Sequence, residues 1–123
     1  MYVVFGMPEI GEKTHRIYNT AVLIGPEGLV GKYRKIHVPD AAEERHFYPG
    51  YEAAVFETHL GKLGLIIYYD VFFSEVSRLT RLQGAQLIAC VSASPKHACI
   101  SHRYAVQPVI VNCSSVSFQQ EYV

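Results

Sequence analysis

The part of the sequence best placed to do chemistry is an apolar strand that runs into an acidic corner and then a helix. This stretch is LGLIIYYDVFFSE, residues 63–75, and its corner begins at Tyr68. A residue between a strand and a helix N-terminus lies beside free backbone N–H groups, which can stabilise an oxyanion. The position suits a nucleophile, although the simpler interpretation of Tyr68 is an aromatic side chain packed in the strand.

A tyrosine at this corner is a weak nucleophile. A phenol has a pKa of about 10 and a thiol one of about 8.5, so at pH 7 about 0.1% of tyrosine is ionised against about 3% of cysteine. Thiolate sulfur is also the better nucleophile toward acyl carbon. Two acidic residues that follow, Asp70 and Glu75, are expected to cap the helix or to bind Arg78.

A lysine and an acidic loop precede the corner. Lys35 stands in GKYRKIHV, where spacing alone favours a solvated edge strand whose lysines discourage aggregation. The alternative is an ammonium aimed into a cleft, where it could protonate a leaving amine or hold an oxyanion. In the loop AEERHFYPG, Glu43 or Glu44 could orient Lys35, or both could pair with other lysines, and spacing does not choose between them.

Composition excludes several classes of function. Lys plus Arg and Asp plus Glu number 11 each, so nothing indicates binding to nucleic acid or to an anionic membrane. The first residues lack a basic segment, and their apolar run is too short for a signal peptide or a membrane span. The three cysteines, Cys90, Cys99 and Cys113, lack CxxC spacing. This predicts neither a disulfide framework nor a zinc knuckle, and makes the cytoplasm the default location.

No cofactor or metal is expected. The six histidines show no HExxH pattern, and no Gly-rich phosphate loop or Ser-centred elbow occurs. HACISH, residues 97–102, could offer two imidazoles and a thiol, but we expect a loop there.

Hydrophobic patterning predicts one α/β domain. A hairpin is expected over residues 20–33, with its turn at Pro26–Gly28, and a helical turn at 41–45. The other expected strands are a short buried one at 3–5, a pair at 54–58 and 63–69, and further strands at 87–91 and 107–112.

A helix is expected between the strands at 63–69 and 87–91. Ser74 can cap it, and Gly84 is its natural end. Its apolar positions are Val76, Leu79 and Leu82. Strand, helix and strand form a βαβ unit with parallel strands and a right-handed crossover.

Three stretches together resemble the carbon–nitrogen hydrolase, or nitrilase, superfamily: YNTAVLIGPEGLVGKYRKIHVP, EERHFYPG and GKLGLIIYYDVFFSEVSRLTRLQGAQLI. The resemblance covers residues 1 to about 95 in order, while residues 96–123 diverge, and the chain would be a single partial domain. It implies a partial α-β-β-α sandwich in a protein that usually dimerises. It also implies hydrolysis of nitriles, amides or N-carbamoyl groups through a Glu-Lys-Cys triad and a thioester acyl-enzyme, without a metal.

The family's residues can be carried over by motif. The pattern YRK-x-H assigns the catalytic lysine to Lys35, and E-x-x-x-F-x-P-G assigns the supporting glutamate to Glu43. In the nucleophile motif, Tyr68 occupies the position of the cysteine, and Ser74 stands where proline is common. The remaining residues of that motif match: Tyr69, Asp70, Phe73 and Glu75.

Other parts of the family pattern are absent. The first glutamate, the general base, comes from a strand that precedes anything present here, and Glu9 does not substitute for it. Cys90 lies within a predicted strand and is not expected to replace the nucleophile. Beyond Pro95 only a shortened echo of the family pattern remains, with Arg103, Ala105 and Asn112 as candidate matches.

The sequence therefore predicts a truncated, degenerate carbon–nitrogen hydrolase that is inactive or severely impaired. Its substrate, if it is active, is a small amide, carbamoyl compound or nitrile. Two alternatives stay open: a non-catalytic module that self-associates through uncovered sheet faces and edges, giving a homo-oligomer, and a fragment of a longer active enzyme.

Overall fold

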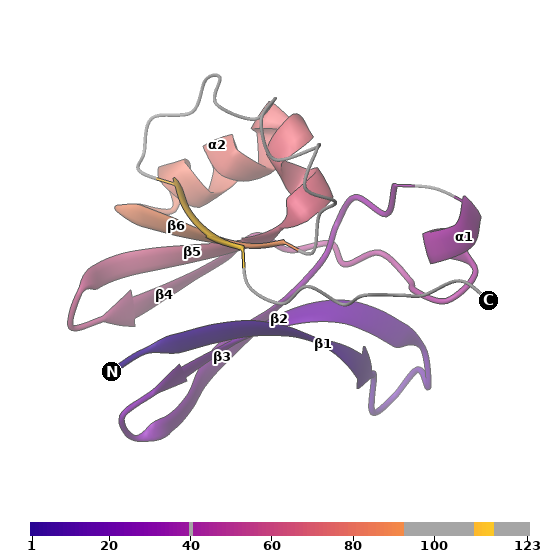
Figure 1. The fold of residues 1–123 in the computed structure, drawn as a ribbon, viewed down its shortest axis with the longest axis horizontal. Coiled ribbons are helices and arrows are strands. Elements are labelled where there is room, and N and C mark those ends of the chain that lie inside the picture. Colours follow the sequence, from indigo (N-terminus) through magenta and orange to yellow (C-terminus); the bar gives the residue numbers. More distant parts are fainter. Residues whose placement is uncertain (40, 93–109, 115–123) are drawn as a thin grey trace.

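The computed structural model describes residues 1–39, 41–92 and 110–114. The strands are β1 (Val3–Ile10), β2 (Ile17–Gly25), β3 (Gly28–Arg34), β4 (Ala54–Thr58), β5 (Gly61–Ile67), β6 (Leu87–Ser92) and β7 (Ile110–Ser114). The helices are α1 (Ala41–Glu44) and α2 (Ser74–Leu82), with a 3-10 turn over Tyr68–Phe72 between β5 and α2. These elements form two sheets, in the orders β1-β2-β3 and β4-β5-β6-β7 (Figure 1).

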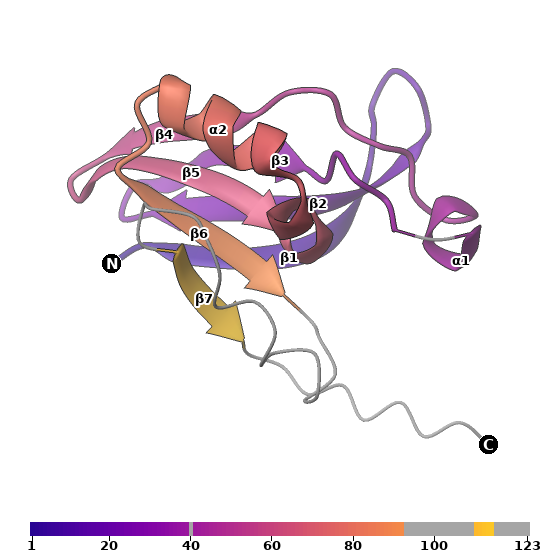
Figure 2. The same ribbon diagram turned by 90° about the horizontal axis from the view of Figure 1, so that it is seen from above.

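The sheets pack against each other, and α2 lies along β5 on the outer side of the second sheet (Figure 2). The arrangement is therefore a partial α-β-β-α sandwich, as expected, in which the described residues supply one helical layer. None of the described helices has the length and apolar character needed to cross a membrane.

The first sheet is an antiparallel meander. The predicted hairpin over 20–33 is confirmed as β2 and β3, whose turn closes at Gly28 with φ 115°, a conformation that glycine adopts without a steric penalty. β1 is longer than predicted. The expectation that residues 3–5 are buried is wrong, because Val3 and Phe5 are each 42% exposed. They lie on an edge strand, and no described helix covers them.

The second sheet contains the predicted βαβ unit. β4 and β5 are antiparallel, β5 and β6 are parallel, and α2 makes the crossover between them. β5 is buried along most of its length, as expected for a strand covered on both faces. β7 runs parallel to β6 over Ile110–Ser114, so part of the strand predicted at 107–112 is confirmed, and residues 107–109 lie outside the described residues.

The helix α2 differs from prediction in two ways. It starts at Ser74 itself, and Phe73 occupies the N-cap position without a side-chain hydrogen bond, so Ser74 is not the cap. Its buried residues are Val76, Ser77 and Thr80, whereas Leu79 and Leu82 are 49% and 70% exposed. Thr80 can face the sheet because its hydroxyl donates to the backbone carbonyls of Val76 and Ser77 within the helix.

The hydrophobic core lies between the sheets and under α2. It joins one cluster of buried side chains: Ala21, Leu23, Tyr33, Leu63, Leu65, Ile66, Ile67, Val76, Ala85, Ile88, Ala89 and Cys90. Because both sheets contribute, the ends of β3 and β5 are held side by side, and these ends carry the candidate site.

Candidate active site

Lys35 follows directly after β3, and its side chain is buried, with 3% of it exposed. Its Nζ donates to both carboxylate oxygens of Glu43, at 2.7 and 2.8 Å. Asn19 Nδ2 donates to Glu43 Oε1 at 3.0 Å. The structure thus places Glu43, and not the exposed Glu44, on the ammonium. β3 is an edge strand, as the simpler interpretation had it, but the expectation that Lys35 is solvated is wrong because its side chain is buried. A buried ammonium needs a partner such as Glu43.

The backbone around Lys35 is held from both sides. Its N–H donates to the carbonyl of Asn19 at 2.8 Å, and its carbonyl accepts from the N–H of Gly50 at 2.7 Å. A Cβ on Gly50 would lie 2.3 Å from the carbonyl oxygen of Arg34. The loop containing the Pro-Gly pair therefore docks on the lysine segment at a distance that only glycine allows.

Tyr68 stands where the sequence predicts the corner. β5 ends at Ile67, and Tyr68 has a φ of 25°, in the region that favours glycine. Such a conformation costs about 1–3 kcal/mol and persists where the surroundings hold the residue in place. The tyrosine ring is half-buried against the core and meets the edge of Phe72, with ring centroids 6.2 Å apart.

Asp70 is fully buried, and its two carboxylate oxygens make four hydrogen-bonding contacts. Oδ2 accepts from Tyr33 Oη at 2.8 Å and from the N–H of Ile67 at 3.1 Å. Oδ1 accepts from the N–H of His37 at 2.9 Å and lies 3.0 Å from His37 Nδ1. The prediction that Asp70 caps the helix or binds Arg78 is wrong, because this carboxylate connects the segment after β3 to the corner after β5.

The groups around Asp70 are fixed by packing. Tyr33 is buried, and its burial together with the Asp70 charge raises the pKa of its phenol above the ordinary value. It therefore stays protonated and donates to Asp70. The imidazole of His37 stacks on Phe73 with centroids 3.7 Å apart and an interplanar angle of 3°.

A hollow of about 480 Å³ lies next to this network. It lies between the lysine segment, the loop that follows α1 and the corner. Its lining is largely aromatic: Ile36, His37, Val38, Glu44, Phe47, Tyr48, Pro49, Tyr69 and Phe73.

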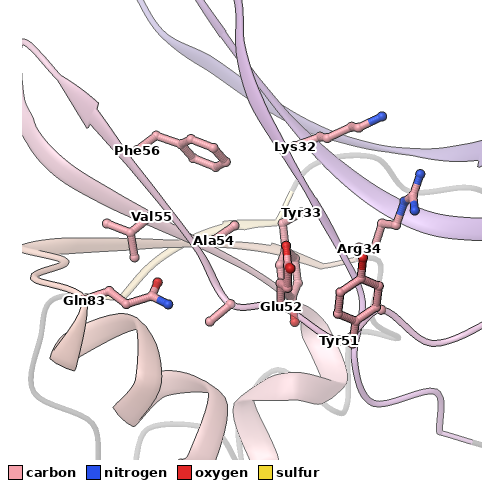
Figure 3. Close-up of a pocket in the computed structure, with 11 residues that line it drawn as sticks. Lys32, Tyr33, Arg34, Tyr51, Glu52, Ala54, Val55, Phe56 and Gln83 are labelled. Atoms are coloured by element: carbon pink, nitrogen blue, oxygen red, sulfur yellow. The ribbon is translucent and has the colours of Figure 1, made fainter.

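A second hollow, of about 400 Å³, opens between β3 and β4. Figure 3 shows Lys32, Tyr33 and Arg34 on β3 and Phe56 on β4. Neither Lys35 nor Tyr68 lines this hollow. The first hollow is not lined by these two residues either, and Tyr33 and Gly50, which contact Asp70 and the Lys35 segment, line the second.

Glu9 belongs to a different cluster from Lys35. Oε1 accepts from Arg34 Nη2 at 2.7 Å and also from Lys32 Nζ. Oε2 accepts from Thr20 Oγ1 at 2.8 Å and from Arg34 Nε at 3.0 Å. These donors, Arg34 above all, lower the pKa of Glu9 from 4.5 to about 2. Both oxygens of Glu9 are therefore engaged with side chains of β2 and β3.

The remaining candidates are placed only in part. Cys90 is buried within β6, and Asn112 lies in β7. Arg103, Ala105 and the HACISH stretch lie outside the described residues. Among the residues that the structure describes, no group of His, Cys, Asp and Glu could hold a metal ion.

Sequence reasoning missed several residues that build the site, namely Asn19, Tyr33, His37, Gly50 and the central role of Asp70. His37, Gly50 and Asp70 each belong to a motif that carries the family resemblance, so a signal was present. The partnership of Tyr33 with Asp70 spans 37 positions, and no local spacing predicts it.

Comparison with known proteins supports the resemblance. The family model for carbon-nitrogen hydrolase matches residues 1–109. The chain is 43% identical over 88 residues to the probable nitrilase C965.09 of Schizosaccharomyces pombe, covering 70% of this chain and 32% of that protein. It is 37% identical over 98 residues to omega-amidase NIT2 of Xenopus tropicalis, covering 72% and 35%. The chain thus spans about a third of the length of these curated relatives.

A solved structure agrees. The crystal structure of Saccharomyces cerevisiae Nit3, a member of branch 10 of the nitrilase superfamily, superposes with a TM-score of 0.68 at 33% identity. The match covers 76% of this chain and 34% of Nit3. With its motifs, its sandwich of sheets and its buried lysine–glutamate pair, the chain belongs to the carbon–nitrogen hydrolase family.

Proposed function

We propose that this chain carries part of a site for hydrolysing a non-peptide C–N bond in a small amide, N-carbamoyl compound or nitrile, and that the chain itself is inactive or severely impaired. The proposal rests on the family membership and on one observation above all. Lys35 is buried with its ammonium on both oxygens of Glu43, on a segment tied through Asp70 to the strained corner at Tyr68.

The chemistry of that arrangement favours acyl transfer. An ammonium held by a carboxylate can stabilise the oxyanion that forms when a nucleophile attacks an acyl carbon, and can donate a proton to a leaving amine. The corner at residue 68 is where the family's nucleophile motif falls. Relatives named as a nitrilase and as an omega-amidase support a substrate with a nitrile or an amide group.

Impairment follows from a difference from the family pattern within the nucleophile motif. The phenol of Tyr68 replaces an easily ionised thiol. Loss of the nucleophile from a concerted catalytic set can reduce turnover by roughly a million-fold.

The test is ammonia release by the purified chain from a small primary amide, an N-carbamoyl amine and an aliphatic nitrile. We expect release at the rate of the buffer control. Turnover that disappears in Lys35→Met, or an acyl group found on Tyr68 by mass spectrometry, would overturn the proposal.

A second candidate function is a non-catalytic module that self-associates. It is favoured by the exposed apolar side chains on the 3-10 turn and α2, where Phe72, Leu79 and Leu82 are 53%, 49% and 70% exposed. Leu79 and Leu82 lie one helical turn apart on α2, and exposed apolar groups that lie together are typical of protein interfaces.

Light scattering after size exclusion tests this candidate. We expect an oligomer that the double substitution Leu79→Glu and Leu82→Glu dissociates. Leu60→Glu is the matched control, since Leu60 is 70% exposed in the turn between β4 and β5. A monomeric wild-type chain would rule the candidate out.

A further inference from the structure

The carboxylate of Asp70 lies at a junction of the chain. Its donors on one side are Tyr33 and His37, which stand two residues before and two residues after Lys35. Its donor on the other side is the N–H of Ile67, the residue immediately before Tyr68. One buried side chain thus bonds to both segments that carry the candidate site.

Burial of the Asp70 carboxylate carries a desolvation cost, and its hydrogen bonds offset that cost. A buried carboxylate is strongly unfavourable unless hydrogen bonds compensate its lost hydration. Here each oxygen has two partners, all between 2.8 and 3.1 Å. A carboxylate so completely bonded specifies one geometry, because shifting either segment would leave a buried acceptor unpaired.

The backbone is strained at Tyr68, beside the residues that Asp70 bonds. Tyr68 has a φ of 25°, and Asp70 fixes the preceding N–H and closes the 3-10 turn, where the N–H of Phe73 donates to the Asp70 carbonyl at 3.1 Å. Strained backbone persists only where surrounding contacts over-determine it. The Asp70 bonds supply such contacts.

We propose that Asp70 is a positioning residue, which holds the Lys35 ammonium close to the side chain at position 68. Asp70 acts through the two segments and does not itself contact a substrate. The inference rests on the proposed function, in which Lys35 and position 68 belong to one site.

The experiment introduces a thiol as a reporter. In Tyr68→Cys, the alkylation rate of the new thiol by iodoacetamide is followed against pH. Mass spectrometry of the peptide that contains residue 68 separates this thiol from Cys90, Cys99 and Cys113. An adjacent ammonium favours the thiolate, so the midpoint should lie about one pH unit below the ordinary value of about 8.5.

Two second-site variants then separate the hypotheses. Lys35→Met in the Tyr68→Cys background should raise the midpoint toward the ordinary value. Asp70→Asn should also raise it, by about half a unit or more, because Lys35 moves away. Simple electrostatics predicts the opposite for Asp70→Asn, since removing a negative charge lowers a thiol pKa. The direction of the shift is therefore diagnostic of positioning.

Controls keep the outcome decisive. Tyr33→Phe removes one of the four hydrogen bonds without changing a charge, should raise the midpoint by a smaller step, and carries the test if Asp70→Asn does not fold. Glu57→Gln, at an exposed ion pair with Lys62, should leave the midpoint of the alkylation rate unchanged. No shift in the Lys35→Met variant would contradict the proposed function. If Lys35→Met raises the midpoint but Asp70→Asn and Tyr33→Phe leave it unchanged or lower it, the positioning role of Asp70 is overturned and the proposed function stands.

Discussion

Gly50 donates its backbone N–H to the carbonyl oxygen of Lys35 at 2.7 Å, and the space beside it has no room for a side chain. The docking of the loop that follows α1 on the lysine segment depends on this contact. It explains in physical terms why a glycine follows the proline in the stretch EERHFYPG.

Gly50→Ala should lower the free energy of unfolding by about 1–3 kcal/mol, because a Cβ would meet the Arg34 carbonyl and push the loop away. Urea denaturation measures the change. Gly84→Ala is a useful comparison, since Gly84 has a φ of 95° but no backbone within reach of a Cβ, and it should cost about 1 kcal/mol from the left-handed conformation alone. An unchanged free energy of unfolding for Gly50→Ala would show that the loop can shift to make room for the methyl group.

The buried ion pair should respond unequally to loss of each partner. Glu43→Leu strands an ammonium that is 3% exposed, whereas Lys35→Met leaves a carboxylate that is 21% exposed and still accepts from Asn19. We expect Glu43→Leu to cost about 3 kcal/mol and Lys35→Met about 1 kcal/mol. Equal losses in denaturant titrations of the two variants would argue against this asymmetry, and the double variant should recover part of the Glu43→Leu loss.

The Glu9 cluster should make stability depend on pH. The pKa of Glu9 is lowered from 4.5 to about 2, so its ionised form stabilises the fold. That contribution is complete above about pH 5 and is lost as the pH falls through about 2. Glu9→Gln should therefore reduce the free energy of unfolding by about 1–3 kcal/mol at pH 7, with the difference from wild type shrinking toward pH 2.

Denaturant titrations from pH 7 to pH 2 check this dependence. Glu57→Gln serves as the control, because the Glu57 side chain is 83% exposed and its ion pair with Lys62 is open to solvent. Its difference from wild type should be negligible at every pH. A constant Glu9→Gln difference across the range would contradict the assignment.

Ser77 offers a route to a more stable protein. Its Oγ is buried and is the side-chain polar atom without a hydrogen-bond partner within the described part of the chain. Ser77→Ala removes this desolvated hydroxyl and raises helix propensity, so it should stabilise the fold by about 0.5–1 kcal/mol. Thr80→Val on the same helix removes a hydroxyl that is bonded to two carbonyls and should cost about 1 kcal/mol. Thermal unfolding distinguishes the two signs.

The sequence predicted the elements well, because patterning and turn residues act locally. The hairpin of β2 and β3, the βαβ unit and the corner at Tyr68 all lie where expected. Apart from the cap of α2 and the length of β1, the errors concern burial. The exposed faces of β1 and α2 were predicted to be covered, and which face of an element is covered depends on its neighbours in space.

The site was predictable to the extent that motifs carry it. Lys35 and Glu43 lie eight residues apart and form an ion pair, as the family pattern implies for two site residues. Asp70 was expected to cap the helix that follows it or to bind Arg78, because sequence spacing indicates only contacts between residues that are close together in the chain. Its actual partners, Tyr33 and His37, reach it only after the two sheets have packed.

The two sheets also differ in how far apart in the sequence their strand partners lie. Short turns join β1 to β2 and β2 to β3, whereas β5 and β6 pair only after the chain has crossed over through residues 68–86. Closing a longer loop costs more entropy before any contact forms, so the first sheet should assemble earlier during folding. Pulse-labelled amide exchange should therefore show that the amides of the β2–β3 hairpin become protected before those of β6. The segment that carries Lys35 would then form before the corner at Tyr68 packs against it.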